Sequence, residues 1–298
     1  MGISFDVINE VAKVSYGEIM SRHTTFSAGG PADGFVEVSC ADELVRLVSL
    51  CHENDIPYIV LGNGSNVLFT DKGYRGLVIH VGRDMSAITV SGNRITAEAG
   101  AMIPKVSTTA QEAGLSGLEF AAGIPGSMGG GLYMNAGAYG GELKDVVVYA
   151  DVCDKFGNVI RLTKDELKLA YRSSIIEEEG YIVLSVCMEL KPDDKEEILA
   201  RMQDYNTRRK TKQPLAYKSA GSTFKRPEGY FAGALIEQCG LKGYSCGSAE
   251  VSELHAGFVI NKNDASAQDI LNVIKHVQDT VYKETGVMLE PEVQIIGE

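Results

Sequence analysis

Long apolar runs are missing from this sequence of 298 residues, and so is a basic N-terminal segment. No stretch of about 18 consecutive apolar residues occurs, which argues against a membrane-spanning helix. The first residues, 1–6, lack the basic start and apolar core of a secretory signal, so we expect no export. These absences predict a protein that does not insert into a membrane.

Paired cysteines and clustered histidines are missing too. Six cysteines are scattered without a C-x-x-C pair, and the five histidines are isolated from one another. In a chain of this size the pattern indicates reduced thiols in the protein core and a cytoplasmic location. The same scatter argues against a metal cluster, and we expect no metal site.

The common nucleotide-binding motifs are absent, although the chain has two glycine-rich turns. The first turn, 61–66, follows an apolar run at 56–60, and the second spans 123–131 and continues into 135–141. Neither ends in the Gly-Lys-Ser/Thr of a P-loop, and Val67 replaces the third glycine of the dinucleotide fingerprint. Glycine amides approach an anion closely, so two facing loops can hold a diphosphate. We therefore predict a dinucleotide cofactor; the alternative is two tight turns between strands.

Acidic residues outnumber basic ones, 40 to 28, but one segment departs from this balance. The net charge of −12 argues against nonspecific binding of nucleic acid. Residues 205–227 nevertheless contain no acidic side chain, and their cations are Arg208, Arg209, Lys210, Lys212, Lys218, Lys225 and Arg226. The first three can be explained by the preference of cations for the C-terminal turn of a helix. The others lie near or beyond Pro214, and we interpret the segment as a site for an anionic ligand.

Hydrophobic periodicity and end signals predict the regular elements. Helices are expected at 41–54, 104–113, 164–170, 193–210, 232–239 and 267–285. Strands are expected at 58–61, 77–81, 87–90, 94–99, 146–153, 159–162, 181–190 and 287–296. Thr163 and Glu166 form the capping box of the helix at 164–170, and residues 156–158 form a hairpin turn.

Seven motifs, read in chain order, resemble the UDP-N-acetylenolpyruvoylglucosamine reductases, flavoenzymes of bacterial cell-wall synthesis, along essentially the whole chain. They are HTTFSAGGPA (23–32), LGNGSNVL (61–68), GIPGSMGGGLYMNAGAYGGE (123–142), YRSS (171–174), RRKTKQP (208–214), AGSTFKRP (220–227) and LEPEVQIIGE (289–298). Only residues 173–180 separate the YR motif from the next expected strand. The chain therefore resembles the branch of the family that lacks an inserted tyrosine loop.

The resemblance implies an α+β chain with an FAD-binding fold of the vanillyl-alcohol-oxidase (PCMH) type. Two α/β subdomains would bind the flavin, and a C-terminal α+β domain would bind the substrate. We place the FAD-binding subdomains at 1–83 and 84–205 and the substrate-binding domain at 206–286. The final strand, within 287–298, would return to the first subdomain.

The resemblance also implies a reaction and its residues. NADPH would reduce FAD, and hydride would pass from flavin N5 to the enolpyruvyl methylene carbon, which yields UDP-N-acetylmuramate. By motif match, Ser222 would donate the proton, and Arg172 and Glu292 would stabilise the carboxylate end of the substrate. Glu292 would then need a pKa raised by burial.

The expected binding residues follow from the same motifs. The cofactor contacts are Gly62, Asn63, Gly64, Ser65, Asn66, Gly123, Ile124, Gly126, Ser127, Gly129, Gly130, Ala136 and Gly137. Lys212, Arg226 and His255 are the candidates for binding the UDP-sugar, although an isolated histidine can equally be a packed core residue. Two alternatives stay open: another flavin oxidase of the same fold, and a non-catalytic module that binds flavin or a UDP-sugar.

Overall fold

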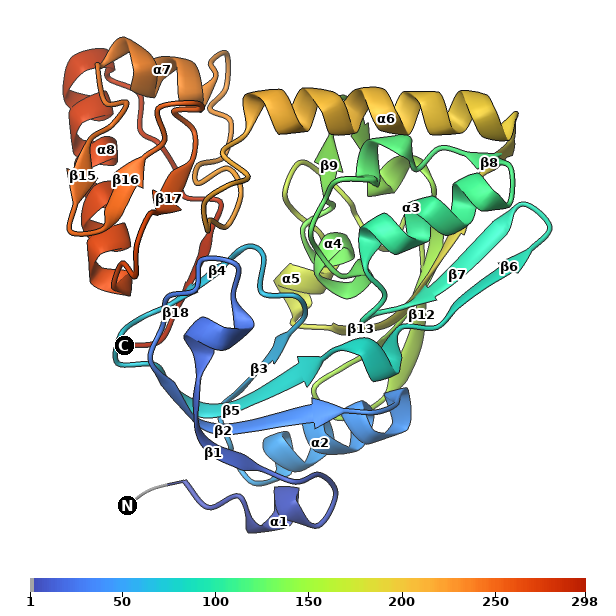
Figure 1. Ribbon diagram of the computed structural model, residues 1–298. Coiled ribbons are helices and arrows are strands. Elements are labelled where there is room, and N and C mark those ends of the chain that lie inside the picture. The colour runs from blue at the N-terminus through green and yellow to red at the C-terminus, as the bar shows by residue number, and fades with distance from the viewer. Residues whose placement is uncertain (1–2) are drawn as a thin grey trace. The chain divides into compact units, whose positions relative to one another are not determined.

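The computed structural model describes residues 3–298, which form two units that each have their own hydrophobic core (Figure 1). The first unit consists of residues 3–16, Gly34–Asn63 and Gly76–Arg209. The second consists of Gly17–Asp33, Gly64–Arg75 and Lys210–Glu298. The functional division of the chain into 1–83, 84–205 and 206–286 remains a prediction.

A four-stranded sheet carries the first glycine-rich turn. Its order is β1 (Ser15–Ile19), β2 (Pro31–Val38), β5 (Tyr74–Val81), β3 (Tyr58–Leu61), and β3 and β5 run parallel. Helix α2 (Ala41–Glu53) buries the predicted stripe of Leu44, Leu47 and Val48 in the same core as Leu77 and Ile79. Helix α1 (Asp6–Asn9) and the 3-10 turn η2 (Arg83–Met85) belong to the first unit.

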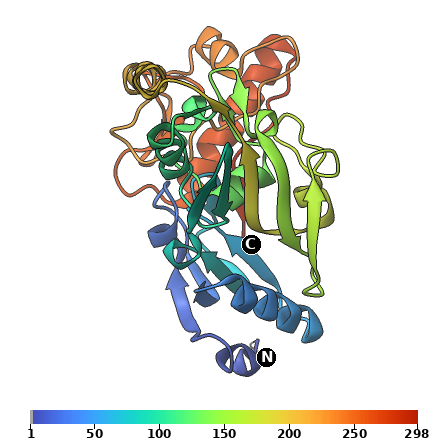
Figure 2. The ribbon, with the colours of Figure 1, turned by 90° about the vertical axis from the view of Figure 1, so that its right-hand side faces the viewer.

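A five-stranded antiparallel sheet lies wholly within the first unit. Its order is β12 (Val159–Thr163), β11 (Val147–Cys153), β13 (Ile182–Glu189), β7 (Arg94–Glu98), β6 (Ile88–Ser91). Helices α3 (Ile103–Glu112) and α4 (Met128–Tyr133) lie on the same side of it (Figures 1 and 2). The hairpin turn predicted at 156–158 is confirmed, because Gly157 has φ +83° and Asp154 Oδ1 accepts from the Phe156 and Asn158 amides.

Shorter elements connect these strands and helices. They are β8 (Leu115–Ser116), η3 (Glu119–Ala121), β9 (Gly137–Ala138), β10 (Gly141–Glu142), η4 (Leu143–Asp145), α5 (Ile175–Glu179) and β14 (Lys191–Pro192). The long helix α6 (Lys195–Lys212) begins two residues later than expected and contributes its residues up to Arg209 to this unit.

The helix predicted at 164–170 is wrong. The expected Thr163–Glu166 contact does form, since the Thr163 hydroxyl and amide both donate to Glu166 Oε2, at 2.7 and 2.8 Å. One turn follows, closed by the Leu167 amide on the Thr163 carbonyl. Lys168 then has φ +46°, which lies outside the right-handed helical region and stops the helix after one turn.

The second unit is built on helix α8 (Ala267–Thr285), which packs against the three-stranded sheet β15 (Ser245–Cys246), β16 (Ala249–Val251), β17 (Val259–Asn261). The predicted apolar stripe is buried: Ile270, Val273, Ile274, Val277 and Val281. Ser266 and Asp269 form a capping box, and Gly286, at φ +74°, ends the helix. Helix α7 (Ala232–Gln238), the turn η1 (Met20–His23) and the strands β4 (Val67–Phe69) and β18 (Gln294–Ile296) complete this unit.

The last strand is shorter than expected. Only β18 (Gln294–Ile296) is regular, and it pairs in parallel with β4 (Val67–Phe69). Residues 287–293 were predicted as strand too, but Pro291 has no N–H to donate and forms only an isolated bridge with Phe224. This irregular segment instead pairs with the loop at 223–225.

The cysteines are all free thiols, but they are not all in the core. Cys51, Cys153 and Cys187 are buried, and burial raises the pKa of Cys51 and Cys153 to about 12. Cys40 is exposed, contrary to the prediction, at the residue that precedes α2. None of the helices within residues 3–298 combines the length and the apolar character that crossing a membrane requires.

Candidate active site

The two glycine-rich turns, loop 1 (61–66) and loop 2 (123–131), meet within the first unit. Asn63 Nδ2 of loop 1 donates a hydrogen bond of 2.6 Å to the Pro125 carbonyl of loop 2. A Cβ placed on Gly62 would lie only 2.2 Å from Ser127 Oγ. The part of loop 1 that ends β3 therefore faces the residues that lead into α4.

Beside this contact between the two loops, the main chain at Gly130 is not covered by side chains, as a diphosphate site requires. A Cβ on Gly130 would have only Ser127 Oγ, at 3.6 Å, as a neighbour within 4 Å. Ser127 precedes α4, and its side chain makes no capping hydrogen bond to the helix. These residues fit a cofactor diphosphate, because small side chains let the main-chain N–H groups approach phosphate oxygens.

Some glycines of loop 2 have a packing reason instead. A Cβ on Gly129 would lie 3.0 Å from Ala99 Cβ, and one on Gly131 would lie 2.6 Å from Ile103 Cδ1. Glycine there lets α4 pack against the end of β7 and the start of α3. The predicted contact of Gly129 with a cofactor is thus not needed to explain the residue.

The loop that carries Arg172 is strained and lies beside Gly137. Arg172 has φ +52°, unusual for a residue with a side chain, in a turn where Ala170 and Ser173 exchange hydrogen bonds. Its guanidinium donates to the Gly137 carbonyl over 3.4 Å. Sequence motifs 35 residues apart are thereby joined, and the strain marks Arg172 as a functional candidate.

Asn135 lies in the motif at 123–142, and its side chain has a structural role. Its side chain is fully buried, and Nδ2 donates 2.9 Å hydrogen bonds to Glu142 Oε2 and the Ala170 carbonyl. Burial acts to raise the pKa of Glu142, but hydrogen bonds from Lys144 and Asn135 and the charge of Arg172 lower it overall. Asn135 therefore ties the β9–β10 hairpin to the Arg172 turn.

In the second unit, Thr223 connects the segments that carry Ser222 and Glu292. Ser222 is exposed and follows Gly221, which has φ +79°. Thr223 is buried; its amide donates to the Gly257 carbonyl, and its carbonyl accepts from the Glu292 amide, both at 2.8 Å. Two of the three predicted catalytic residues thus lie on adjacent segments, 70 positions apart in the sequence.

Two N-terminal motifs reach the same place. Asn66 donates from Nδ2 to the Glu292 carbonyl at 3.0 Å, and its own carbonyl accepts from Gln294. Thr25 Oγ1 donates to the Ser219 carbonyl at 2.7 Å, and the Thr25 amide donates to Gly64. Four of the motifs therefore converge in the second unit.

The predicted substrate residues have different surroundings. Lys212 is exposed at the end of α6, and the Arg226 guanidinium carbon lies 4.0 Å from the Phe231 ring centroid, a cation–π distance. His255 is half-buried, and Nδ1 accepts from the Gly257 amide at 3.1 Å. Burial lowers the pKa of His255, so it is neutral near pH 7. His255 thereby holds the loop on which Thr223 rests.

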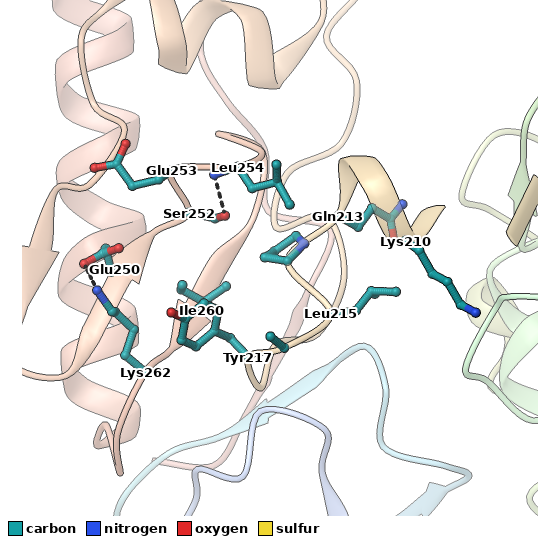
Figure 3. A pocket seen from close by; sticks show the side chains of 12 residues that line it. Lys210, Gln213, Leu215, Tyr217, Glu250, Ser252, Glu253, Leu254, Ile260 and Lys262 are labelled. Atoms are coloured by element: carbon teal, nitrogen blue, oxygen red, sulfur yellow. Dashed lines mark hydrogen bonds and ion pairs between the residues drawn. The ribbon is translucent and has the colours of Figure 1, made fainter. Parts of the chain in front are cut away.

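A pocket of about 370 Å³ lies elsewhere in the second unit (Figure 3). The segment 213–217 forms one side, and Glu250, Ile260 and Lys262 of the sheet region form another. Lys262 Nζ pairs with Glu250 Oε2 at 2.9 Å. Neither Ser222 and Glu292 nor Lys212, Arg226 and His255 line this pocket.

Gln213, on the edge of that pocket, holds a buried Oε1 without a hydrogen-bond partner among the described residues. Gln213→Leu is expected to raise the free energy of unfolding by about 1 kcal/mol, because it removes an unsatisfied acceptor. The matched control is Gln278→Leu, which should lower it, since Gln278 Nε2 donates to the Leu289 carbonyl at 2.8 Å. Urea denaturation measures both; a loss of stability in Gln213→Leu would contradict this expectation.

Comparison with known proteins gives consistent results along the chain. Residues 32–163 match the model of an FAD binding domain, and residues 213–296 match that of the UDP-N-acetylenolpyruvoylglucosamine reductase C-terminal domain. An Agathobacter rectalis protein named UDP-N-acetylenolpyruvoylglucosamine reductase is 53% identical over 94% of this chain and 93% of its own. One of the same name from Caldanaerobacter subterraneus is 46% identical over 99% of both chains.

Solved structures agree. The crystal structure of the UDP-N-acetylenolpyruvylglucosamine reductase of Thermus caldophilus matches with a TM-score of 0.84 and 36% identity, over 96% of this chain and 100% of that one. A cholesterol oxidase from B. sterolicum matches with a TM-score of 0.51 and 15% identity, over 64% of this chain and 40% of its own, which shows the fold alone. The predicted FAD-binding fold with a C-terminal domain is confirmed.

Proposed function

This chain belongs to the UDP-N-acetylenolpyruvoylglucosamine reductase family, and from that membership we propose that it reduces the enolpyruvyl group of that UDP-sugar to give UDP-N-acetylmuramate. It is an FAD-dependent oxidoreductase of peptidoglycan precursor synthesis that uses NADPH as reductant. When bound, FAD supplies the hydride, which it receives from NADPH, to the methylene carbon of the enol ether.

The chain's own residues supply the proton and stabilise charge. Hydride addition leaves negative charge on the carbon that bears the carboxylate, and one proton at that carbon completes the saturation of the double bond. We assign this proton to Ser222 Oγ, whose segment is fixed to that of Glu292 through the Thr223 carbonyl. Arg172 and Glu292 would stabilise the developing charge. The convergence of Ser222 and Glu292 is the observation that supports these roles.

The test of the function is NADPH oxidation by the purified chain, followed at 340 nm, with and without the enolpyruvyl UDP-sugar. We expect oxidation to require the UDP-sugar and to proceed mole for mole with it under anaerobic conditions. Rapid oxidation with oxygen and none with the UDP-sugar would instead indicate a flavin oxidase. A chain that binds FAD but is never reduced by NADPH would be a binding module.

Lys212→Ala is expected to raise the KM for the UDP-sugar about tenfold while kcat changes little. A phosphate contact is largely the same in the ground and transition states, so its loss acts on binding. The effect should shrink as ionic strength rises. Lys283→Ala, which removes the same charge from the exposed end of α8, is the control and should leave KM unchanged. A fall in kcat alone would assign Lys212 to the chemistry.

A further inference from the structure

Arg209, near the end of α6, points at loop 2 within the first unit. A Cβ on Gly123 would lie 2.9 Å from Arg209 Cδ and 3.2 Å from Arg209 Nη1. Asn206 Oδ1 lies 3.0 Å from the same point, and residues three apart share one face of a helix. Glycine at position 123 therefore leaves the room that these two side chains occupy beside the loop.

The chain that follows loop 2 packs on the same helix face. The ring of Tyr139 stacks on that of Tyr205, with centroids 4.9 Å apart and planes 10° apart. Tyr205 is one turn before Arg209, and Tyr139 has φ +53°. The last turns of α6 thus form one side of the region bounded by loop 2.

Arg209 is half-buried and has no counter-ion among the residues that the structure describes. The other two arginines of α6 are paired: Arg201 with Glu119 at 2.9 Å, and Arg208 with Asp204 at 2.7 Å. Burial lowers the pKa of Arg209, and the nearby Tyr139 acts in the opposite direction. A cation partly withdrawn from water without a partner is unfavourable, which indicates an anion supplied by a ligand.

The preference of cations for a helix C-terminus does not explain this arrangement. A solvent-exposed guanidinium near the last carbonyls of the helix is enough to satisfy that preference. Arg208 in the same turn is exposed, whereas the Arg209 side chain turns inward to Gly123. The position of Arg209 is therefore set by the loop and not by the helix end.

We propose that Arg209 is a phosphate-binding residue whose guanidinium donates hydrogen bonds to the diphosphate of FAD held at loop 2, which rests on the proposed function. Main-chain donors alone leave the two negative charges of a diphosphate without a counter-charge. A guanidinium offers several donors in one plane and suits phosphate oxygens. The cofactor site then consists of the neutral loops and one cation, the Arg209 guanidinium on α6.

The full chain, stripped of flavin, is titrated with FAD and with riboflavin, which lacks phosphate, and binding is followed by flavin fluorescence. Arg209→Met keeps the length of the side chain and removes its charge. It should weaken FAD binding by about 10- to 100-fold and leave riboflavin binding unchanged. Arg209→Lys should recover part of the loss. Arg208→Met, the matched control in the same turn, should bind FAD like the wild type.

The other outcomes separate the alternatives. Unchanged FAD binding in Arg209→Met, with a raised KM for the UDP-sugar, would assign Arg209 to the substrate diphosphate and overturn the proposal. An equal loss of FAD and riboflavin binding would indicate a structural role and overturn it too. A wild-type chain that binds no FAD would contradict the proposed function itself, whereas wild-type affinity for both ligands in Arg209→Met contradicts only this inference.

Discussion

Ser222→Ala is expected to leave the reduction of flavin by NADPH nearly unchanged and to slow its reoxidation by the UDP-sugar by more than the ~10²–10⁴-fold typical of a general acid. The first half-reaction needs no proton from Ser222. In the second, the intermediate that is not protonated returns to substrate, so the whole rate depends on this donor. Stopped-flow absorbance of the flavin, recorded separately for NADPH and for the UDP-sugar, measures the two halves.

The structure indicates that Ser222→Ala removes the hydroxyl without disturbing neighbouring contacts. Ser222 is exposed, and its side chain makes no hydrogen bond within the described residues, so alanine should not disturb folding. Ser222→Cys should recover part of the rate, because a thiol also donates a proton. Ser219→Ala, in the same turn, is the control and should keep both half-reactions, since Ser219 is held through its carbonyl. Equal damage to both half-reactions in Ser222→Ala would refute the role of Ser222 as proton donor.

Gly62→Val is the second large effect, and the expected result is a chain that folds but carries no flavin. The Cβ alone would come within 2.2 Å of Ser127 Oγ, so the added side chain would force loop 1 and loop 2 apart. The absorbance near 450 nm per mole of protein measures bound FAD, and circular dichroism checks the fold.

The control for Gly62→Val is Gly92→Ala, in the turn between β6 and β7, where a Cβ would have no neighbour within 4 Å. Gly92 has φ +61°, so the alanine variant should lose a little stability, but it should keep its flavin. Stoichiometric FAD in Gly62→Val would mean that the cofactor diphosphate does not bind where the two loops meet.

The local sequence pattern was sufficient to predict most of the helices and strands. The apolar stripes of α2 and α8 predicted which faces are buried, and Ser266, Asp269 and Gly286 marked both ends of α8. These signals work because a helix repeats every 3.6 residues and its ends need partners for free N–H and C=O groups. The two failures have local causes that periodicity does not encode: Lys168 has a positive φ within 164–170, and residues 287–293 pair with the loop at 223–225.

The sequence by itself determined the motifs, their order and hence the family, together with the two loops and the basic segment. Only the tertiary structure decided what these residues touch. Thr223 joins Ser222 to Glu292, Asn135 braces the turn of Arg172, and Gly129 serves packing. Such contacts join segments tens to hundreds of residues apart, and no periodic signal along the chain specifies them. Arg209 illustrates the difference: in the sequence it is one cation of a cluster, and its burial beside Gly123 exists only in the folded chain.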